Sequence, residues 1–173
     1  MKLIVALFLI AASTSVYSGS QEMRGDKSFQ ATVGLGYDYK LYQTSITVSK
    51  FLDADNMIGI HAGQGDDGDD HQTTVGIQSK HFLGNSFYIA PELYYLNYFE
   101  TDDDKDIFDS IDEKITALGL SVRIGNQWQF KGVTLGCDWF GAGRNLVHWK
   151  RTDDFLSNPY TFTILNFYVG WSF

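Results

Sequence analysis

Apolar and polar residues alternate along most of this chain, and the alternation is clearest between residues 28 and 39. One set of alternate positions there holds Phe29, Ala31, Val33, Leu35, Tyr37 and Tyr39. The positions between them hold Gln30, Thr32, Gly34, Gly36 and Asp38. Successive side chains of a β-strand point to opposite faces, so this period of two predicts a strand with one apolar and one polar face.

The same period recurs often enough to predict eight strands, at about residues 28–39, 42–51, 57–64, 72–82, 86–99, 116–124, 133–139 and 165–173. Short turns are expected at 53–56 and 84–85, and a third either at 125–126 or at 131–132. Longer polar loops are expected at 65–71, 101–113 and 143–159, whereas the connection at 38–41 is brief. An even strand count with turns on one side and loops on the other is typical of membrane β-barrels. The predicted fold class is therefore all-β, an eight-stranded antiparallel up-and-down transmembrane barrel.

A soluble barrel of lipocalin type, apolar inside and polar outside, would show the same alternation with its faces reversed. The polar face of the predicted strands carries many glycines: Gly34, Gly36, Gly59, Gly63, Gly76, Gly119, Gly136 and Gly170. Small side chains suit the crowded interior of a narrow barrel better than a solvated exterior. Aromatic residues near the strand ends suit the two interfacial girdles of a membrane barrel: Tyr37, Tyr39, Tyr95, Phe99, Trp128, Trp139, Trp171 and Phe173. The glycines and aromatics therefore favour the membrane barrel.

The first residues are typical of an export signal. Lys2 is followed by an unbroken apolar run from Leu3 to Ala12 and then by small residues, with the favoured cleavage after Ser18. The alternative, a membrane-anchoring helix, is disfavoured because the run is short for about 30 Å of hydrocarbon. No cysteine follows the run, so a lipoprotein signal is not expected. The predicted domains are a signal peptide at 1–18 and a barrel at 19–173.

The charged residues are unevenly spread over a chain of net charge −8. More than half of the 21 acidic side chains fall in two clusters, at 66–70 and 102–113, which leaves the segments between them nearly neutral. An acidic chain without a basic stripe argues against nucleic-acid binding. Cys137 is the only cysteine, so no intrachain disulfide is possible, and the alternation places it on the lipid face as a small apolar residue.

The last residues repeat the strand pattern up to an aromatic terminus. Leu165, Phe167, Val169, Trp171 and Phe173 alternate with Asn166, Tyr168, Gly170 and Ser172. With the export signal, strand count and loop asymmetry, this ending resembles the small eight-stranded outer-membrane proteins, the group containing the OmpA transmembrane domain, OmpX and OmpW. The resemblance implies location in the cell outer membrane and a C-terminal assembly signal, formed here by Tyr168, Gly170, Trp171 and Phe173, that the barrel-assembly machinery reads. It implies an architecture and not a function, because such barrels include anchors, adhesins, channels and enzymes.

Three charged residues fall on the polar face of successive predicted strands: Glu92, Arg123 and Asp138. An unpaired charge inside a barrel is costly, so we expect them to pair in one ionic layer. The layer either fills an interior too narrow for bulk water or forms a path or gate for protons or ions. The structural interpretation is preferred because eight strands leave little room inside.

The sequence predicts no catalytic site, metal site or cofactor. The loop at 102–113 has acidic residues at EF-hand spacing, but Ile107 replaces the required glycine and strands flank the loop. Lipid A deacylases of similar architecture use a His-x-Ser pair, whereas His148 is followed by Trp149 and Lys150. His61, His71 and His81 lie in no recognised catalytic motif, although a distant serine could meet one of them in space.

We therefore expect a monomeric structural or surface-binding barrel with a side-chain-filled interior and no chemistry. The alternatives are a narrow channel for small or apolar solutes and a lipid A-modifying enzyme. Outer-membrane lipid and lipopolysaccharide are the expected partners. Arg144, Lys150 and Arg151 are candidates to bind lipopolysaccharide phosphates through charge-assisted hydrogen bonds.

Overall fold

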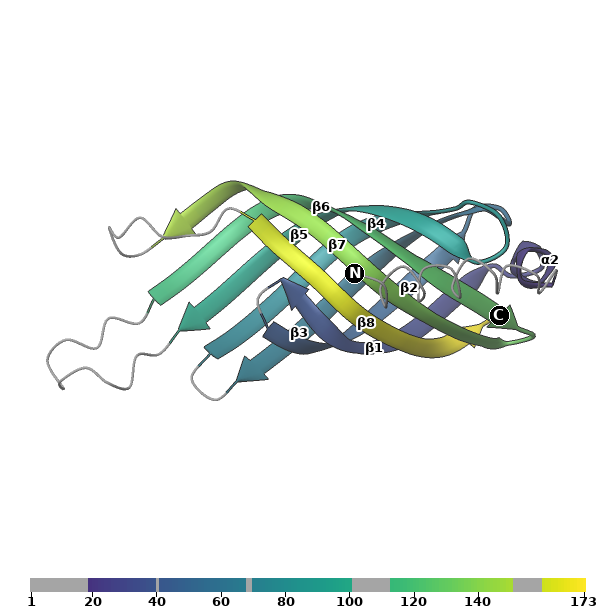
Figure 1. Ribbon diagram of the computed structural model, residues 1–173, viewed down its shortest axis with the longest axis horizontal. Helices are drawn as coiled ribbons and strands as arrows, with labels where there is room; N and C mark the ends of the chain where they lie inside the picture. Colours follow the sequence, from purple (N-terminus) through teal and green to yellow (C-terminus); the bar gives the residue numbers. More distant parts are fainter. Residues whose placement is uncertain (1–18, 40, 68–69, 101–112, 151–159) are drawn as a thin grey trace, which may run out of the picture.

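The computed structural model describes residues 19–39, 41–67, 70–100, 113–150 and 160–173. It contains one short helix and eight strands in these parts of the chain: α2 Ser20–Gly25, β1 Phe29–Tyr39, β2 Leu41–Phe51, β3 Asn56–Asp67, β4 Asp70–Phe82, β5 Phe87–Glu100, β6 Glu113–Phe130, β7 Val133–Lys150 and β8 Tyr160–Ser172. Each strand pairs antiparallel with the next, and β1 also pairs with β8, so the sheet closes into a barrel (Figure 1). The predicted fold class is confirmed.

Closure joins the first and last strands of the barrel. Gln30 on β1 lies opposite Ser172 on β8, and the backbone N–H of Phe173 donates to the carbonyl of Phe29 at 2.9 Å. The helix α2 lies at the same end of the barrel as the C-terminus (Figure 1). The three short turns also lie at this end, which we call the short-turn end.

Burial along the strands follows the alternation, with polar side chains inside and apolar ones outside. Val33 and Val169 are 57% and 52% exposed, whereas Gln127 and Thr74 on the inner face are fully buried. This is the reverse of a soluble barrel and matches a wall that faces lipid. No helix in the described residues is long and apolar enough to cross a bilayer.

The third short turn falls at Lys131–Gly132, between β6 and β7. Lys131 takes φ 55°, and a Cβ on Gly132 would lie 2.4 Å from the Trp171 ring, so the tight turn and the close approach both explain the glycine. The alternative turn at 125–126 is wrong, because both residues lie within β6.

Several strand ends differ from the prediction. The expected loop at 65–71 is largely paired: Asp66 faces His71 across β3 and β4, and Asp66 Oδ2 lies 2.9 Å from His71 Nδ1. The expected loop at 143–159 begins later, because β7 continues to Lys150. The strands thus continue into segments that polarity alone suggested should be loops.

Tyr39 and Cys137 lie in environments that the alternation did not predict, whereas Leu165 stays on the outward face despite an irregular backbone. Tyr39 takes φ 62° at the end of β1 and is buried among interior residues, so its assignment to the outer girdle is wrong. Leu165 takes φ 49° in β8, beside a register shift against β1. Cys137 follows Leu135 on the predicted outward set but is only 2% exposed, so its assignment to the lipid face is wrong.

Candidate functional site

Arg123 of β6 lies inside the barrel at the centre of an ionic layer. Its Nη2 is 2.7 Å from Glu92 Oε2 on β5, and its Nη1 is 3.6 Å from Asp138 Oδ2 on β7. The structure therefore brings together the three residues that the alternation placed on one face. A third carboxylate, Asp38 of β1, lies closer than Asp138, with 2.8 Å between Asp38 Oδ2 and Arg123 Nη1. One guanidinium thus contacts carboxylates from three other strands.

Each carboxylate of the layer has further donors. Gln43 Nε2 donates to Asp38 at 3.0 Å, and Asn166 Nδ2 donates to Asp138 at 3.0 Å. Glu92 is bound on both oxygens, because His61 Nδ1 lies 2.9 Å from Oε1 while Oε2 faces Arg123. Buried charges require such partners to offset their desolvation. The layer is therefore a connected network spanning the barrel, not an isolated pair.

Lys80 of β4 occupies the next level towards the short-turn end. Its ammonium donates to Gln127 Oε1 and to the Tyr168 hydroxyl, both at 3.0 Å. It also lies 4.1 Å and 4.6 Å from the ring centroids of Tyr88 and Tyr168. Neutral acceptors and two aromatic faces hold this cation, an arrangement that relies on cation–π attraction in a dry environment.

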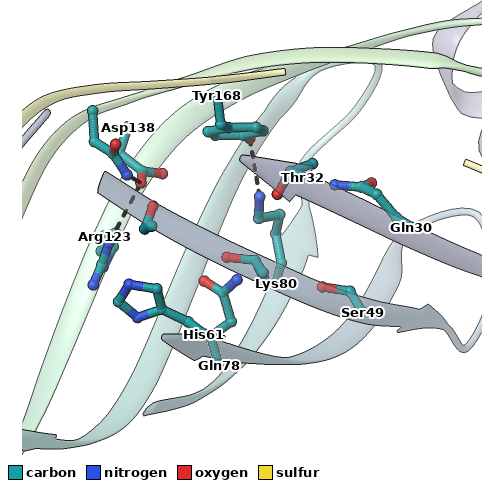
Figure 2. Close-up of a pocket in the computed structure, with 12 residues that line it drawn as sticks. Gln30, Thr32, Ser49, His61, Gln78, Lys80, Arg123, Asp138 and Tyr168 are labelled. Carbon is teal, nitrogen blue, oxygen red and sulfur yellow. Dashed lines mark hydrogen bonds and ion pairs between the residues drawn. The ribbon is translucent and has the colours of Figure 1, made fainter. Parts of the chain in front are cut away.

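A small cavity separates these two levels (Figure 2). Its volume is about 20 Å³, which is room for about one water molecule. Lys80, Arg123, Asp138 and Tyr168 line it, and so does His61, whose Nε2 is buried without a hydrogen-bond partner among the described residues. The cavity is polar and is lined by side chains of the barrel interior.

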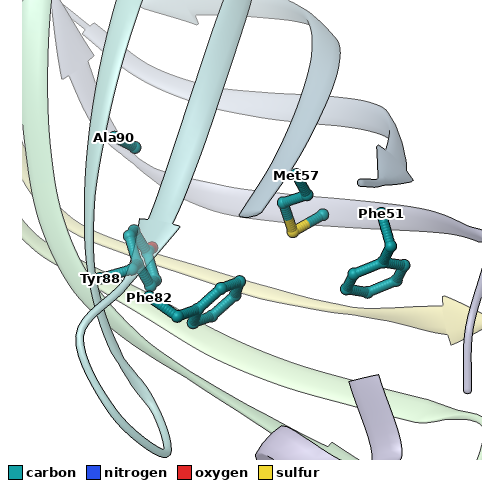
Figure 3. Close-up of a cluster of buried hydrophobic side chains, with 5 residues drawn as sticks. All are labelled: Phe51, Met57, Phe82, Tyr88 and Ala90. Carbon is teal, nitrogen blue, oxygen red and sulfur yellow. The ribbon is translucent and has the colours of Figure 1, made fainter. Parts of the chain in front are cut away.

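An apolar layer closes the interior near the short-turn end (Figure 3). It consists of Phe51, Met57, Phe82, Tyr88 and Ala90. Arg24 of α2 covers this layer: its guanidinium lies 3.8 Å from the Phe82 ring centroid. Arg24 also donates to the carbonyls of Ala54, Gly84 and Asn85, so the helix is fastened to two neighbouring turns.

Further apolar residues fill the interior towards the opposite end. One cluster contains Tyr39, Tyr94, Leu96 and Ala117, and the other contains Leu41, Tyr98 and Ile115. The Tyr39 hydroxyl also accepts a hydrogen bond from Arg123 Nη2 at 3.2 Å, which couples this layer to the ionic one. The described interior is therefore a polar centre between two apolar layers.

The candidate lipopolysaccharide contacts do not all fall within the described residues. Arg144 is exposed on β7 and lies opposite Leu120, an outward residue of β6. It borders an open groove on the outer wall that Leu120, Val122 and Ala142 also line. The Lys150 side chain and all of Arg151 lie outside the described residues, as do the loop at 102–113, the His148 side chain and the predicted signal at 1–18.

The four residues of the predicted assembly signal divide between the two faces of β8. Trp171 and Phe173 are 57% and 63% exposed on the outside. Tyr168 points inward to Lys80, and Gly170 lies so close to β1 that a Cβ would lie 2.0 Å from the Ala31 carbonyl. Tyr168 thus has a structural role in the lumen that is separate from its predicted role in assembly.

The alternation placed Asp38, His61 and Lys80 on the inner face, yet sequence reasoning included neither Asp38 and His61 in the ionic layer nor Lys80 in the level beside it. The available signal was that each of them occupies the inward set of alternate positions on its strand, as Glu92 and Arg123 do. The sequence did not give the position of each residue along the barrel axis. Strand tilt and register set that position and decide which inward residues meet. Within the described residues, no group of three or more His, Cys, Asp or Glu side chains is placed to hold a metal ion.

The fold defines the class of protein: an eight-stranded β-barrel of the outer-membrane type. It is similar to the N-terminal β-barrel domain of Pseudomonas aeruginosa OprF, with a TM-score of 0.58, 11% identity, and coverage of 86% of this chain and 99% of that one. It is also similar to Neisserial surface protein A (NspA), with a TM-score of 0.56, 13% identity, and coverage of 84% and 95%. A third similar structure is a major outer membrane protein from Thermus thermophilus, with a TM-score of 0.55, 12% identity, and coverage of 86% of this chain and 100% of that one. No model of a known protein family matches the sequence, and no curated protein matches it.

Proposed function

We propose that this protein is a structural and surface-binding barrel of the outer membrane whose interior does not conduct. The observation that carries the proposal is the position of Arg123, bound to Glu92 and Asp38 at 2.7 and 2.8 Å between two apolar layers. Ions would have to break this network and displace the apolar side chains to pass. An eight-stranded barrel has room for side chains but not for an aqueous channel.

Planar-bilayer recording of the purified, folded chain tests this proposal. We expect no discrete conductance steps, under conditions in which a general porin conducts. Reproducible steps from the wild-type chain would overturn the sealed-lumen function. Fractionation of cells tests the location separately: we expect a heat-modifiable band in the outer membrane after removal of residues 1–18, with loss of assembly when Phe173 is deleted.

A narrow path for small or apolar solutes is the second candidate, and the cavity beside Lys80 and His61 favours it. The cavity shows that packing in the polar centre is incomplete. Displacing Arg123 would connect this cavity with the apolar cluster that contains Tyr39, on the other side of the ionic layer. If Arg123→Met conducts while the wild-type chain does not, the layer acts as a barrier that a conformational change could open.

Contact with lipid phosphate is the surface function that we propose. Arg144 follows Val133, the first residue of β7, by eleven positions. At about 3.3 Å per residue and a tilt of about 40°, this places Arg144 about 25–28 Å above the turn, near the upper edge of an apolar band about 25 Å tall. Its guanidinium can bind a lipopolysaccharide phosphate while the apolar groove accepts an acyl chain. We expect Arg144→Ala to weaken lipopolysaccharide binding and its salt dependence, and Lys131→Ala, a change of an exposed lysine in the short turn between β6 and β7, to leave both unchanged.

A further inference from the structure

Four polar side chains form a hydrogen-bonded chain on the outer wall near the short-turn end. Ser79 Oγ lies 3.0 Å from His81 Nε2, both on β4. His81 Nδ1 lies 2.8 Å from Asn56 Oδ1 on β3. Asn56 Nδ2 donates to both carboxylate oxygens of Asp53 at 2.9 Å. His81 is exposed, and Ser79 and Asn56 are half-buried, so the chain is accessible from outside the barrel.

The order of donors and acceptors fixes the proton positions along this chain. Asp53 can only accept, so the amide nitrogen of Asn56 must face it and the amide oxygen must face His81. That oxygen can only accept, so Nδ1 of His81 carries a proton, and in the neutral imidazole Nε2 then presents its lone pair to Ser79. Ser79 therefore donates its hydroxyl proton to His81. This is the arrangement of a nucleophile, a general base and a group that orients the base.

We propose that Ser79 and His81 form a catalytic pair that hydrolyses acyl esters, with Asn56 and Asp53 as positioning residues. The proposal goes beyond a sealed structural barrel and departs from the expected absence of catalysis. The turn at 53–56 explains only part of this hydrogen-bonded series. Within the turn, Asp53 accepts from the backbone N–H of Asp55 at 2.7 Å and from the Asn56 side chain. The Ser79–His81 hydrogen bond lies outside that turn.

The surroundings indicate the substrate class. Ile58 lies opposite Ser79 on one side and Lys50 on the other, so the three residues form one outward row across β2, β3 and β4. At about 4.8 Å between strands, the Cα atoms of Lys50 and Ser79 are about 10 Å apart. Ile58 is 43% exposed and offers an apolar surface between the hydroxyl and the ammonium. A glycerophospholipid fits this row, with its acyl ester at Ser79 and its phosphate at Lys50.

The reaction follows the usual two steps of acyl transfer. Ser79 Oγ attacks the ester carbonyl carbon while its proton passes to His81 Nε2, and the carbon–oxygen bond to the glycerol then breaks. His81 gives that proton to the departing glycerol oxygen, which leaves an acyl group on Ser79. Water attacks the acyl group, His81 accepts a proton from the water, and Ser79 Oγ leaves and recovers it. The products are a fatty acid and a lysophospholipid.

The test uses the full purified barrel, folded in detergent micelles and in phosphatidylethanolamine vesicles. An alkyl fluorophosphonate should label the wild-type chain at Ser79, identified by peptide mass spectrometry. The chain should also hydrolyse 4-nitrophenyl octanoate and release fatty acid from the vesicles. Ser79→Ala and His81→Asn should each lower kcat/KM at least 100-fold. Thr73→Ala, which removes another exposed outward hydroxyl of β4, should change it less than twofold.

Two further variants separate positioning and binding from chemistry. Asn56→Ala should lower kcat about tenfold with KM unchanged, because it disorients His81 without touching substrate. Lys50→Ala should raise KM for an anionic phospholipid and leave 4-nitrophenyl octanoate unaffected. Heat-modifiable migration identical to that of the wild-type chain establishes that each variant is folded.

The proposal is overturned if the folded wild-type chain takes no label at Ser79, or if its hydrolysis equals that of Ser79→Ala. It is also overturned if His81→Asn retains full activity. None of these results bears on the sealed lumen, which conductance tests independently.

Discussion

Arg123 and Glu92 form a buried ion pair across neighbouring strands β6 and β5, with 2.7 Å between Nη2 and Oε2 and both side chains inaccessible to solvent. The same guanidinium contacts Asp38 and Asp138. Removing Arg123 would leave three carboxylates in the barrel interior without their shared cation. The stability of the polar centre therefore depends on Arg123 more than on any one of its acidic partners.

We expect Arg123→Met to lower the free energy of unfolding by about 3–5 kcal/mol, the usual effect of removing one partner of a buried ion pair. Urea unfolding of the barrel in lipid vesicles measures it. Ser121→Ala is the matched control: it removes a single hydrogen bond to Glu92 from the same strand and should cost about 1 kcal/mol. Equal effects of the two substitutions would contradict the central role of Arg123.

Lys80 offers a contrast, because no carboxylate of the described residues lies within ion-pair distance of its ammonium. Lys80→Met keeps most of the packing and loses two hydrogen bonds and the contacts with Tyr88 and Tyr168. We expect a loss of about 1–2 kcal/mol, smaller than for Arg123→Met, because no buried anion loses its only cation. The same urea titration compares the two variants, and a larger loss for Lys80→Met would show that Lys80 neutralises the layer at a distance.

The alternation of residue types was sufficient to predict the barrel, since a period of two with glycines and polar residues on one face has few other solutions. It also placed Glu92, Arg123 and Asp138 on the inner face. The backbone irregularities were not predictable, because Tyr39 and Leu165 depart from the pattern through positive φ angles that no glycine marks. Tyr39 therefore lies inside, beside Arg123, and not in the outer girdle.

The hydrogen-bonded chain on the outer wall was also beyond sequence reasoning. Ser79 and His81 are two positions apart, but their orienting partner Asn56 lies on another strand. Only the register of β3 against β4, which sets Asn56 opposite His81, brings them together. The search for a His-x-Ser pair therefore missed a serine that precedes the histidine.

Arg24 is the next test, because it donates three hydrogen bonds from α2 to carbonyls of the barrel turns. Its side chain is fully buried and donates to carbonyls of two turns. Burial lowers the pKa of Arg24 to about 10, partly offset by Asp55, so the group remains charged at neutral pH. We expect Arg24→Ala to cost about 1.5–3 kcal/mol, as for hydrogen bonds made by a charged group. Hydrogen exchange should show faster exchange at the turn containing Gly84 and Asn85, with Arg24→Lys intermediate; unchanged protection in Arg24→Ala would mean that the helix is held by other contacts.

Asp53 provides a pH-dependent test of the chain that orients His81. Hydrogen bonds from the Asn56 side chain and from the backbone N–H of Asp55 favour the ionised carboxylate, so the pKa of Asp53 lies below its ordinary value of 3.8. A carboxyl group whose pKa is depressed by folding stabilises the folded state above pH 3.8, and this contribution is lost as the pH falls through the lower folded pKa. The Asn56 side-chain NH₂ resonances should therefore titrate with a midpoint below pH 3.8. In Asp53→Ala this acidic transition should disappear while the barrel stays folded. A transition with its midpoint above pH 4 in the wild-type chain would show that Asn56 does not hold the carboxylate as the structure indicates.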